Sequence, residues 1–224
     1  EMMKLTMAIA PLNATYEGTL VLNNIVGEFT QMGMSLPLNL SKGEKAEKPR
    51  RPQEPKAPFP YKSEEVFFKN TREDFTLAGT LTIPEGEGPF PAMILVTGSG
   101  AQNRDEELMD HKPFAVIADY LSRNGVAVLR FDDRGVGSSE PGNPDATSFD
   151  LSYDAEAAFD YLLSRKEVIP SLCGITGHSE GGYINFMVAR RRPDVAFVIS
   201  LAGPAVTGAE VMKLQQAEVY RGMG

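Results

Sequence analysis

The chain has 224 residues, of which 42% are hydrophobic and 23% are charged, and Cys173 is its single cysteine. This length suffices for one good hydrophobic core and a small appendage. The sequence has no run of about 18 apolar residues, which excludes an ordinary transmembrane helix, and one cysteine excludes an intrachain disulfide. We interpret Cys173 as a small core residue, because it stands in an apolar stretch.

The formal charge of −8 is distributed unevenly. Residues 1–60 hold seven Lys or Arg and six Asp or Glu, which leaves a balance of −9 for residues 61–224. An acidic main domain is a poor match for a phosphate backbone. We therefore expect no nucleic-acid partner.

Residues 1–41 are predicted to be a β-rich segment. Two apolar runs, at 19–22 and 25–29, flank Asn23-Asn24, which is typical of a tight hairpin turn. Residues 35–40 alternate in polarity and predict another strand. Because two or three strands are not stable alone in water, we interpret the segment as the tail of a preceding β-domain or as an arm packed on the next domain.

Residues 42–60 are predicted to be a linker. They combine Lys and Arg with five prolines, namely Pro49, Pro52, Pro55, Pro58 and Pro60. Proline at this density favours an extended, semi-rigid spacer over a helix or a strand. The alternative interpretation is a basic segment that binds a peptide.

From Tyr61 onward the pattern is one of strands that alternate with helices. Strands are predicted at 65–69, 75–83, 92–96, 126–131, 172–175 and 195–201, and helices at 113–125, 151–162, 180–192 and 209–221. This alternation predicts an α/β fold with a doubly wound, mostly parallel sheet covered on both faces. Ligands of such a sheet bind at the carboxyl ends of its strands.

The most informative stretch is Gly177-His178-Ser179-Glu180-Gly181. It follows a short apolar run and precedes an amphipathic helical pattern, so it fits the Gly-x-Ser-x-Gly turn that presents a nucleophilic serine between a strand and a helix. The two glycines leave room for a strained backbone at the serine. We therefore predict Ser179 to be a nucleophile. The alternative is a glycine-rich turn with no chemistry.

A serine nucleophile also needs donors for the oxyanion that forms on acyl attack. One donor is expected to be the backbone N–H of Glu180, the residue after the nucleophile. The other is expected in the loop Thr97-Gly98-Ser99-Gly100, at the end of an earlier strand, with Ser99 as the first choice and Gly98 as the near alternative.

The general base that activates a serine is harder to find. His178 adjoins Ser179, and because neighbouring side chains diverge at such a turn, we expect it to pack beneath the turn. His111 could line the pocket, although helix entry is the favoured interpretation, and Arg134 is the other candidate pocket-lining residue. The loop acids near Arg104 and Arg134 are expected to form ion pairs that hold the loops together; they are Asp105, Glu106, Asp132 and Asp133.

Three motifs together resemble the α/β-hydrolase superfamily, and in chain order they are Thr97–Gly100, Phe131-Asp132-Asp133-Arg134-Gly135-Val136-Gly137-Ser138-Ser139 and Gly177–Gly181. Over about residues 61–204 the chain is most similar to bacterial serine esterases related to dienelactone hydrolases and acyl-CoA thioester hydrolases. Residues 15–40 are similar to the last strands of a lipocalin-like β-domain that precedes some such esterases, which favours an extracytoplasmic location. Thr97 stands where many members carry histidine.

The resemblance implies that residues 61–224 are a partial α/β-hydrolase domain, with residues 205–224 as the start of a cap. In the superfamily the triad acid and histidine follow the nucleophile after later strands, so we expect both beyond Gly224. A sheet that stops after the 195–201 strand would leave an open edge, and we expect self-association through it.

The function so implied is a serine hydrolase that cleaves small-molecule carboxylic esters through an acyl-enzyme on Ser179, without a cofactor or metal. The alternatives of the same fold are an acyl thioesterase or acyltransferase and a serine peptidase. The alternative of another class is a non-catalytic binding module. The identity of the acyl group stays open, because specificity depends on the cap and the loops.

Overall fold

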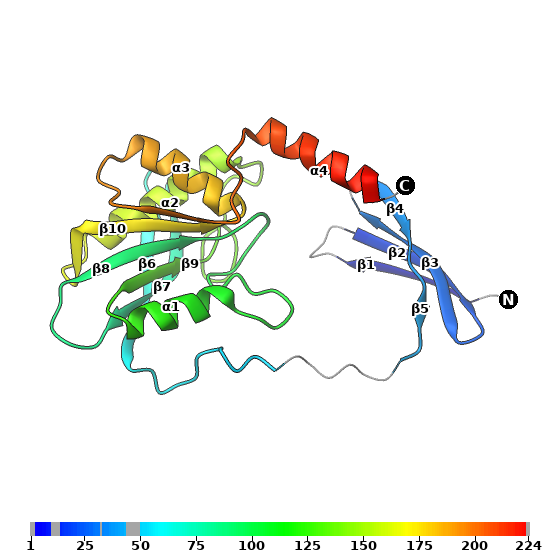
Figure 1. Ribbon diagram of the computed structural model, residues 1–224, viewed down its shortest axis with the longest axis horizontal. Helices are drawn as coiled ribbons and strands as arrows, with labels where there is room; N and C mark the ends of the chain where they lie inside the picture. Colours follow the sequence, from blue (N-terminus) through cyan, green and yellow to red (C-terminus); the bar gives the residue numbers. More distant parts are fainter. Residues whose placement is uncertain (1–2, 10–13, 32, 44–49, 223–224) are drawn as a thin grey trace. The chain divides into compact units, whose positions relative to one another are not determined.

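The computed structural model describes residues 3–9, 14–31, 33–43 and 50–222, and the chain divides into two units, 1–50 and 51–224 (Figure 1). The first unit is an antiparallel sheet of five strands. Its strands are β1 (Lys4–Ile9), β2 (Ala14–Val21), β3 (Asn24–Gln31), β4 (Met34–Pro37) and β5 (Leu40–Ser41). β1 to β4 are neighbours in chain order and β5 also pairs with β3, so the predicted β-rich character of this segment is confirmed.

Tyr16 is buried in the small sheet, with 1% of its surface exposed. Its hydroxyl donates to the carbonyl of Leu38 at 3.0 Å, which ties β2 to the segment after β4. Gly18 and Gly27 face each other across β2 and β3, and a Cβ on either would approach the Tyr16 hydroxyl within 2.8 Å. The two glycines therefore make room for the tyrosine ring.

The hairpin turn lies one residue earlier than predicted. Val21 pairs with Asn24, so the two turn residues are Leu22 and Asn23, and Asn24 belongs to β3. Leu22 adopts a positive φ of 57° and is exposed, which frees Asn24 for the ladder. The prediction placed the turn at the two asparagines because asparagine tolerates positive φ better than leucine.

The predicted linker, 42–60, is divided between the two units. Residues 44–49 lie outside the described residues, and the second unit begins at Arg51. The Glu54 carboxylate accepts the backbone N–H of Lys112 at 3.0 Å and lies 3.1 Å from His111 Nδ1. The proline-rich stretch after Arg51 is thus bonded to the second unit.

The second unit is built on a mixed sheet of six strands in the order β11-β10-β8-β9-β7-β6. The strands are β6 (Tyr61–Asn70), β7 (Phe75–Pro84), β8 (Phe90–Val96), β9 (Ala127–Phe131), β10 (Val168–His178) and β11 (Val198–Leu201). The four from β11 to β9 are parallel, while β7 and β6 are antiparallel. The predicted α/β class with a mostly parallel sheet is confirmed.

Helices cover both faces of this sheet, as its apolar strands require (Figure 1). Helix α1 (Pro113–Arg123) lies on one face, where Phe114 and Ala118 pack with Met93, Leu95 and Val128. Helices α2 (Ser148–Leu163) and α3 (Glu180–Arg191) lie on the other. Their side chains Phe159, Leu162, Ile184 and Val188 join the larger core of β6 to β10. Cys173 belongs to this core, as predicted.

Two features complete the second unit. β11 is the edge strand of the sheet, and helix α4 (Gly208–Gly222) follows it, with Met212 and Leu214 more than half exposed.

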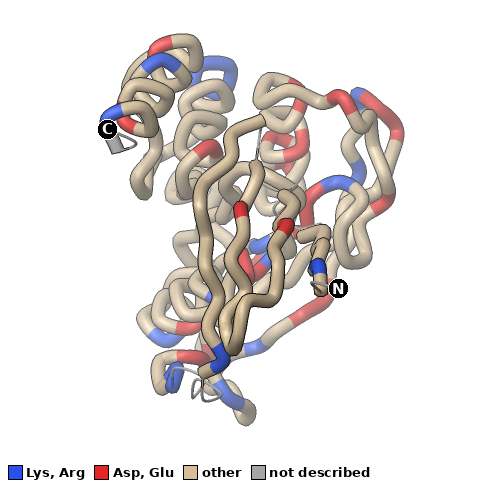
Figure 2. Tube along the Cα trace, turned by 90° about the vertical axis from the view of Figure 1, so that its right-hand side faces the viewer, with Lys and Arg blue, Asp and Glu red and all other residues tan. Residues whose placement is uncertain are grey.

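No described helix is long and apolar enough to cross a bilayer. In the view of Figure 2, Lys and Arg are interspersed with Asp and Glu and do not gather in one basic stripe. Self-association through the β11 edge stays a prediction.

The contact of Glu54 generates a test by limited proteolysis. Lys56 is exposed, but the bonds of Glu54 to His111 and Lys112 restrain the backbone around it. We expect Glu54→Ala to accelerate tryptic cleavage after Lys56 several-fold, because proteases need a mobile segment. Glu87→Ala, at an exposed loop position, is the control. Equal cleavage rates after Lys56 in the three proteins would contradict this prediction.

Candidate active site

Ser179 lies at a sharp junction between a strand and a helix. β10 ends at His178 and α3 begins at Glu180, so the serine is the single connecting residue. Its backbone has φ 51° and ψ −115°, a combination that residues other than glycine rarely adopt. Such strain persists only where the surroundings enforce it, and it gathers at functional sites. The geometry matches the nucleophile turn that the sequence predicts.

Backbone packing around the junction explains the glycines of the motif. A Cβ on Gly181 would lie 2.2 Å from the carbonyl oxygen of Val96 on β8, and one on Gly177 would lie 2.2 Å from the carbonyl of Gly181. A Cβ on Gly182 would lie 2.8 Å from Gly203 Cα. No side chain fits at these positions, so the helix can pack directly on the strand ends and hold Ser179 above them.

A pocket of about 460 Å³ opens beside Ser179. Its walls come from the start of α2, the first turn of α3, the loop after β11 and α4; the lining residues are Ser148, Ser179, Glu180, Tyr183, Ala202, Pro204, Gly208, Val211, Met212 and Gln215. Helix α4, in the segment predicted to begin a cap, thus forms one wall. The serine therefore faces a space that can hold a small molecule with an apolar part.

The N-terminus of α3 supplies positive polarity at the serine. Glu180 is the first residue of the helix, where backbone N–H groups have no acceptor within the helix and the helix dipole is positive. The Glu180 side chain does not accept these N–H groups. Its carboxylate instead accepts a hydrogen bond from the Ser148 hydroxyl on α2. The role of the Glu180 backbone N–H as one oxyanion donor stays a prediction.

The loop after β8 lies against the serine, as predicted. A Cβ on Gly98 would be 3.3 Å from Ser179 Cβ, so the loop backbone reaches the nucleophile. The Gly98 N–H donates to Glu106 Oε1 at 2.7 Å. Since that N–H is engaged, the geometry favours Ser99 over Gly98 as the second oxyanion donor.

His178 is bonded to Glu106, a loop acid expected to pair with an arginine. Its Nδ1 lies 2.8 Å from Glu106 Oε1, the same oxygen that accepts the Gly98 N–H. The His178 side chain is 45% exposed, so the expectation that it packs beneath the turn is wrong. Glu106 itself is 8% exposed and has a positive φ of 50°, and its loop carries it inward from a position that predicts an ordinary surface acid.

Two of the loop acids form ion pairs, as predicted. Arg104 binds Asp132 through Nε at 3.1 Å and Nη2 at 2.6 Å, and Arg130 binds Asp105. Burial alone would raise the pKa of Asp132, but the side-chain and backbone hydrogen bonds from Arg104 hold that pKa below its usual range. These pairs join the loop after β8 to β9 and the loop that follows it.

The expectation of an ion pair is wrong for Asp133, because the partners of its carboxylate among the described residues are neutral. Its carboxylate accepts the Thr97 hydroxyl at 2.7 Å and the Gln102 N–H at 2.8 Å. Burial raises the pKa of Asp133 to about 7, although both hydrogen bonds oppose that shift. The sequence contained one signal of this contact: Thr97 and Asp133 follow β8 and β9, two strands predicted to be parallel, so their ends meet.

The structure places the candidate pocket-lining residues elsewhere. His111 stands at the entry of α1 and is bonded to Glu54, which agrees with the helix-entry interpretation. The Arg134 side chain is 8% exposed and binds Asp154 and Glu73. Neither residue lines the pocket at Ser179. Within the described ranges, no three His, Cys, Asp or Glu residues gather in a way that could hold a metal ion.

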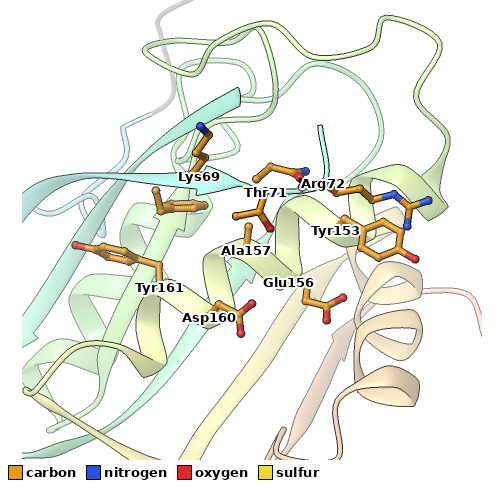
Figure 3. A pocket seen from close by; sticks show the side chains of 10 residues that line it. Lys69, Thr71, Arg72, Tyr153, Glu156, Ala157, Asp160 and Tyr161 are labelled. Carbon is orange, nitrogen blue, oxygen red and sulfur yellow. Dashed lines mark hydrogen bonds between the residues drawn. The ribbon is translucent and has the colours of Figure 1, made fainter. Parts of the chain in front are cut away.

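A second cavity, of about 420 Å³, lies between the end of β6 and helix α2 (Figure 3). Lys69, Thr71 and Arg72 form one side of it, and Tyr153, Glu156, Asp160 and Tyr161 project from α2 on the other. Three of its charges form ion pairs, Lys69 with Asp74, Glu156 with Arg191 and Asp160 with Arg192. The guanidinium of Arg72 lies over the Tyr153 ring, 3.8 Å from its centroid. The cavity shares no lining residue with the pocket at Ser179.

The close packing of Gly181 generates a stability prediction. We expect Gly181→Ala to lower the free energy of unfolding by more than about 2 kcal/mol, because the new Cβ meets the backbone of β8. Gly208→Ala is the control, since no atom lies within 4 Å of the position that its methyl group would take. Urea unfolding of both variants measures the difference. Equal stability of the two variants would refute the prediction.

The raised pKa of Asp133 generates a pH prediction. The folded state holds this proton up to a pH of about 7, and the unfolded chain releases it near the usual 3.8. Folding stability should therefore fall as pH rises between these values. Relative to Asp133→Asn, which cannot ionise, the native protein should lose up to about 4 kcal/mol across this window.

Urea unfolding at pH 5 and pH 8 measures this trend. Asp132→Asn is the comparison, because the pKa of Asp132 is held below its usual range and contributes no slope above pH 5. A stability difference between the native protein and Asp133→Asn that is the same at both pH values would contradict the prediction.

Known proteins similar to this chain are consistent with the geometry. The sequence profile of the family described as Serine aminopeptidase, S33, matches residues 110–221, which is half of the chain. Esterase EstD of Thermotoga maritima is 37% identical over 139 residues, which cover 62% of this chain and 33% of EstD. Acyl-coenzyme A thioesterase 3 of Mus musculus is 31% identical over 126 residues, which cover 55% of this chain and 26% of that protein.

The fold recurs among solved structures. The α/β hydrolase GrgF of a Penicillium species superposes with a TM-score of 0.56 at 23% identity, over 72% of this chain and 54% of GrgF. The chain spans between a quarter and a half of the length of the curated relatives to which it is similar. From the matched profile, the strand order and the strained serine at the β10–α3 junction together, we conclude that the chain belongs to the α/β-hydrolase superfamily, in the serine aminopeptidase S33 family.

Proposed function

We propose that the chain carries the nucleophile and the oxyanion donors of a serine hydrolase that cleaves carboxylic esters. The observation that carries the proposal is the backbone of Ser179, held at φ 51° above the strand ends and next to a pocket of about 460 Å³. Likeness to an esterase at 37% identity supports the choice of ester substrates. The apolar side chains of Val211 and Met212 in the pocket wall suit an apolar acyl or alcohol group.

The proposed reaction has two steps. In the first step the Ser179 hydroxyl loses its proton to a general base and attacks the ester carbonyl. The oxyanion that forms accepts hydrogen bonds from the backbone N–H groups of Glu180 and Ser99. The alcohol then leaves with the proton that the base returns. A water molecule then attacks the acyl-enzyme, is deprotonated by the same base, and releases the carboxylic acid and the free serine.

The base of this reaction is proposed to be a histidine outside residues 1–224. In the described part of the chain neither His111 nor His178 makes a hydrogen bond to the Ser179 hydroxyl, and neither lines the pocket. In the superfamily the acid and the histidine follow the nucleophile in chain order. The chain spans 33% of EstD, so a related complete enzyme has room for both.

A thioesterase is the second candidate. It is favoured by the 31% identity to acyl-coenzyme A thioesterase 3, and it uses the same serine and oxyanion donors on a different acyl carrier. Purified full-length protein should be tested on p-nitrophenyl esters, acyl-CoA thioesters and aminoacyl nitroanilides. Faster hydrolysis of acyl-CoA at equal concentration would replace the ester assignment, and faster hydrolysis of the anilides would favour a peptidase.

The nucleophile is tested separately from the substrate class. We expect Ser179→Ala to lower kcat by about 10⁴-fold or more, because the acylated hydroxyl is gone, and to abolish labelling by a fluorophosphonate. Ser171→Ala, an exposed position near the other end of β10, is the matched control and should keep full activity. If the folded native protein neither turns over the three substrate classes nor labels at Ser179, the binding-module alternative takes the place of the enzyme.

A further inference from the structure

Asp133 closes the loop from Thr97 to Gln102 at both of its ends. At the first end, Oδ1 accepts the Thr97 hydroxyl at 2.7 Å, and at the second end, Oδ2 accepts the Gln102 N–H at 2.8 Å. The Asp133 N–H donates in turn to the Gln102 carbonyl at 3.1 Å. One residue of the loop after β9 therefore makes three hydrogen bonds to the loop after β8.

The loop so closed is the one that approaches the nucleophile. It contains Gly98, whose Cβ would lie 3.3 Å from Ser179 Cβ, and Gly100, which has a positive φ of 94°. Two glycines in six residues make the isolated backbone flexible. An oxyanion donor must be held within about half an ångström of its productive position, so a loop of this composition needs restraints from outside.

The partners of Asp133 distinguish it from the acids around it. Asp132, Asp105 and Asp154 each pair with an arginine. In the described part of the chain Asp133 has no ion pair, and its carboxylate serves a hydroxyl and a backbone N–H of the loop. Burying an unpaired carboxylate lowers folding stability, and the raised pKa of Asp133 reflects that loss. If Asp133 served only to join the two loops, an arginine partner for its carboxylate would give the folded protein greater stability.

We propose that Asp133 is a positioning residue that, through Thr97 and Gln102, holds the loop so that the Ser99 N–H faces the oxyanion formed at Ser179. The inference rests on the proposed function of Ser179. It assigns Asp133 no contact with substrate. It also gives Thr97 a role, because the Thr97 hydroxyl is the side-chain donor of this loop to the Asp133 carboxylate.

Loss of the Asp133 hydrogen bonds is expected to lower kcat and to weaken the binding of an analogue of the tetrahedral intermediate. Asp133→Ala should lower kcat for the best ester about 10- to 100-fold, less than the loss of a whole oxyanion donor, with KM within threefold. A trifluoromethyl ketone that forms a tetrahedral adduct with the serine should bind weaker by a similar factor. Asp133→Asn should restore most of kcat, because its amide can accept the Gln102 N–H and donate to the Thr97 hydroxyl.

Thr97 supplies a second, milder pair of variants. Thr97→Val removes the hydroxyl and keeps the shape, and should lower kcat about fivefold or more, whereas Thr97→Ser keeps the donor and should lose less than twofold. Glu107→Gln is the control: it removes a charge from the neighbouring loop, where Glu107 is bonded to the Asn103 side chain and not to residues 97–102. Rates are measured well below each melting temperature and per folded molecule.

The outcomes separate this inference from the proposed function. A merely structural role predicts a lower melting temperature with unchanged kcat and unchanged analogue affinity in folded Asp133→Ala, and that result would overturn the inference while Ser179 still labels. If Asp133→Ala does not fold, equal kcat for Thr97→Val and Thr97→Ser would overturn it instead. If native Ser179 neither labels nor turns over ester, the proposed function fails and the inference fails with it.

Discussion

The rest of the site depends on one contact, the approach of Gly181 on α3 to the backbone of β8. A Cβ at Gly181 would meet the Val96 carbonyl at 2.2 Å, so the helix sits closer to the strand ends than any side chain permits. That approach leaves the connecting residue no relaxed conformation, and Ser179 takes φ 51° and ψ −115°. The cost of order 1–3 kcal/mol for such a backbone is offset by the cores on both faces of the sheet.

Acidic side chains organise the loops around the serine in three different ways. Asp132 and Asp105 form ion pairs with Arg104 and Arg130, which tie the loop after β8 to β9. Glu106 accepts a hydrogen bond from the Gly98 backbone N–H and lies within hydrogen-bond distance of His178 Nδ1. Asp133 closes the remaining part of the loop through neutral donors. Around the site, these acidic side chains hold the backbone of the loops in place.

The pocket at Ser179 and the cavity of Figure 3 show why volume alone does not identify a site. The two are of similar size, at about 460 and 420 Å³. Only the first borders a strained backbone, a helix N-terminus and a glycine loop, and these three features meet at Ser179. The second is lined by charges, and three of them pair with residues of the surrounding helices and strands. The difference between the two cavities therefore lies in the residues that line them and not in their volume.

The sequence alone determined the elements of the second unit and the turn that presents Ser179. Alternating strands and helices predict a parallel sheet, and Gly177, Ser179 and Gly181 at fixed spacing predict the turn, because both signals are local and each follows from steric limits on the backbone. The extent of β11 and the Leu22–Asn23 turn were misjudged by a few residues, since pairing with a neighbouring strand decides where a strand ends.

Only the tertiary structure decided the contacts between loops. Glu54 at the entry of α1, Glu106 on Gly98 and Asp133 on Thr97 join residues 58, 8 and 36 positions apart. Nothing in the local pattern separates such an acid from a solvated one, because a carboxylate in a loop is equally compatible with either. The packing of parallel strand ends brings the loops together, and burial then forces each acid to find a donor. The tertiary structure therefore decided which backbone N–H groups stay available to the serine.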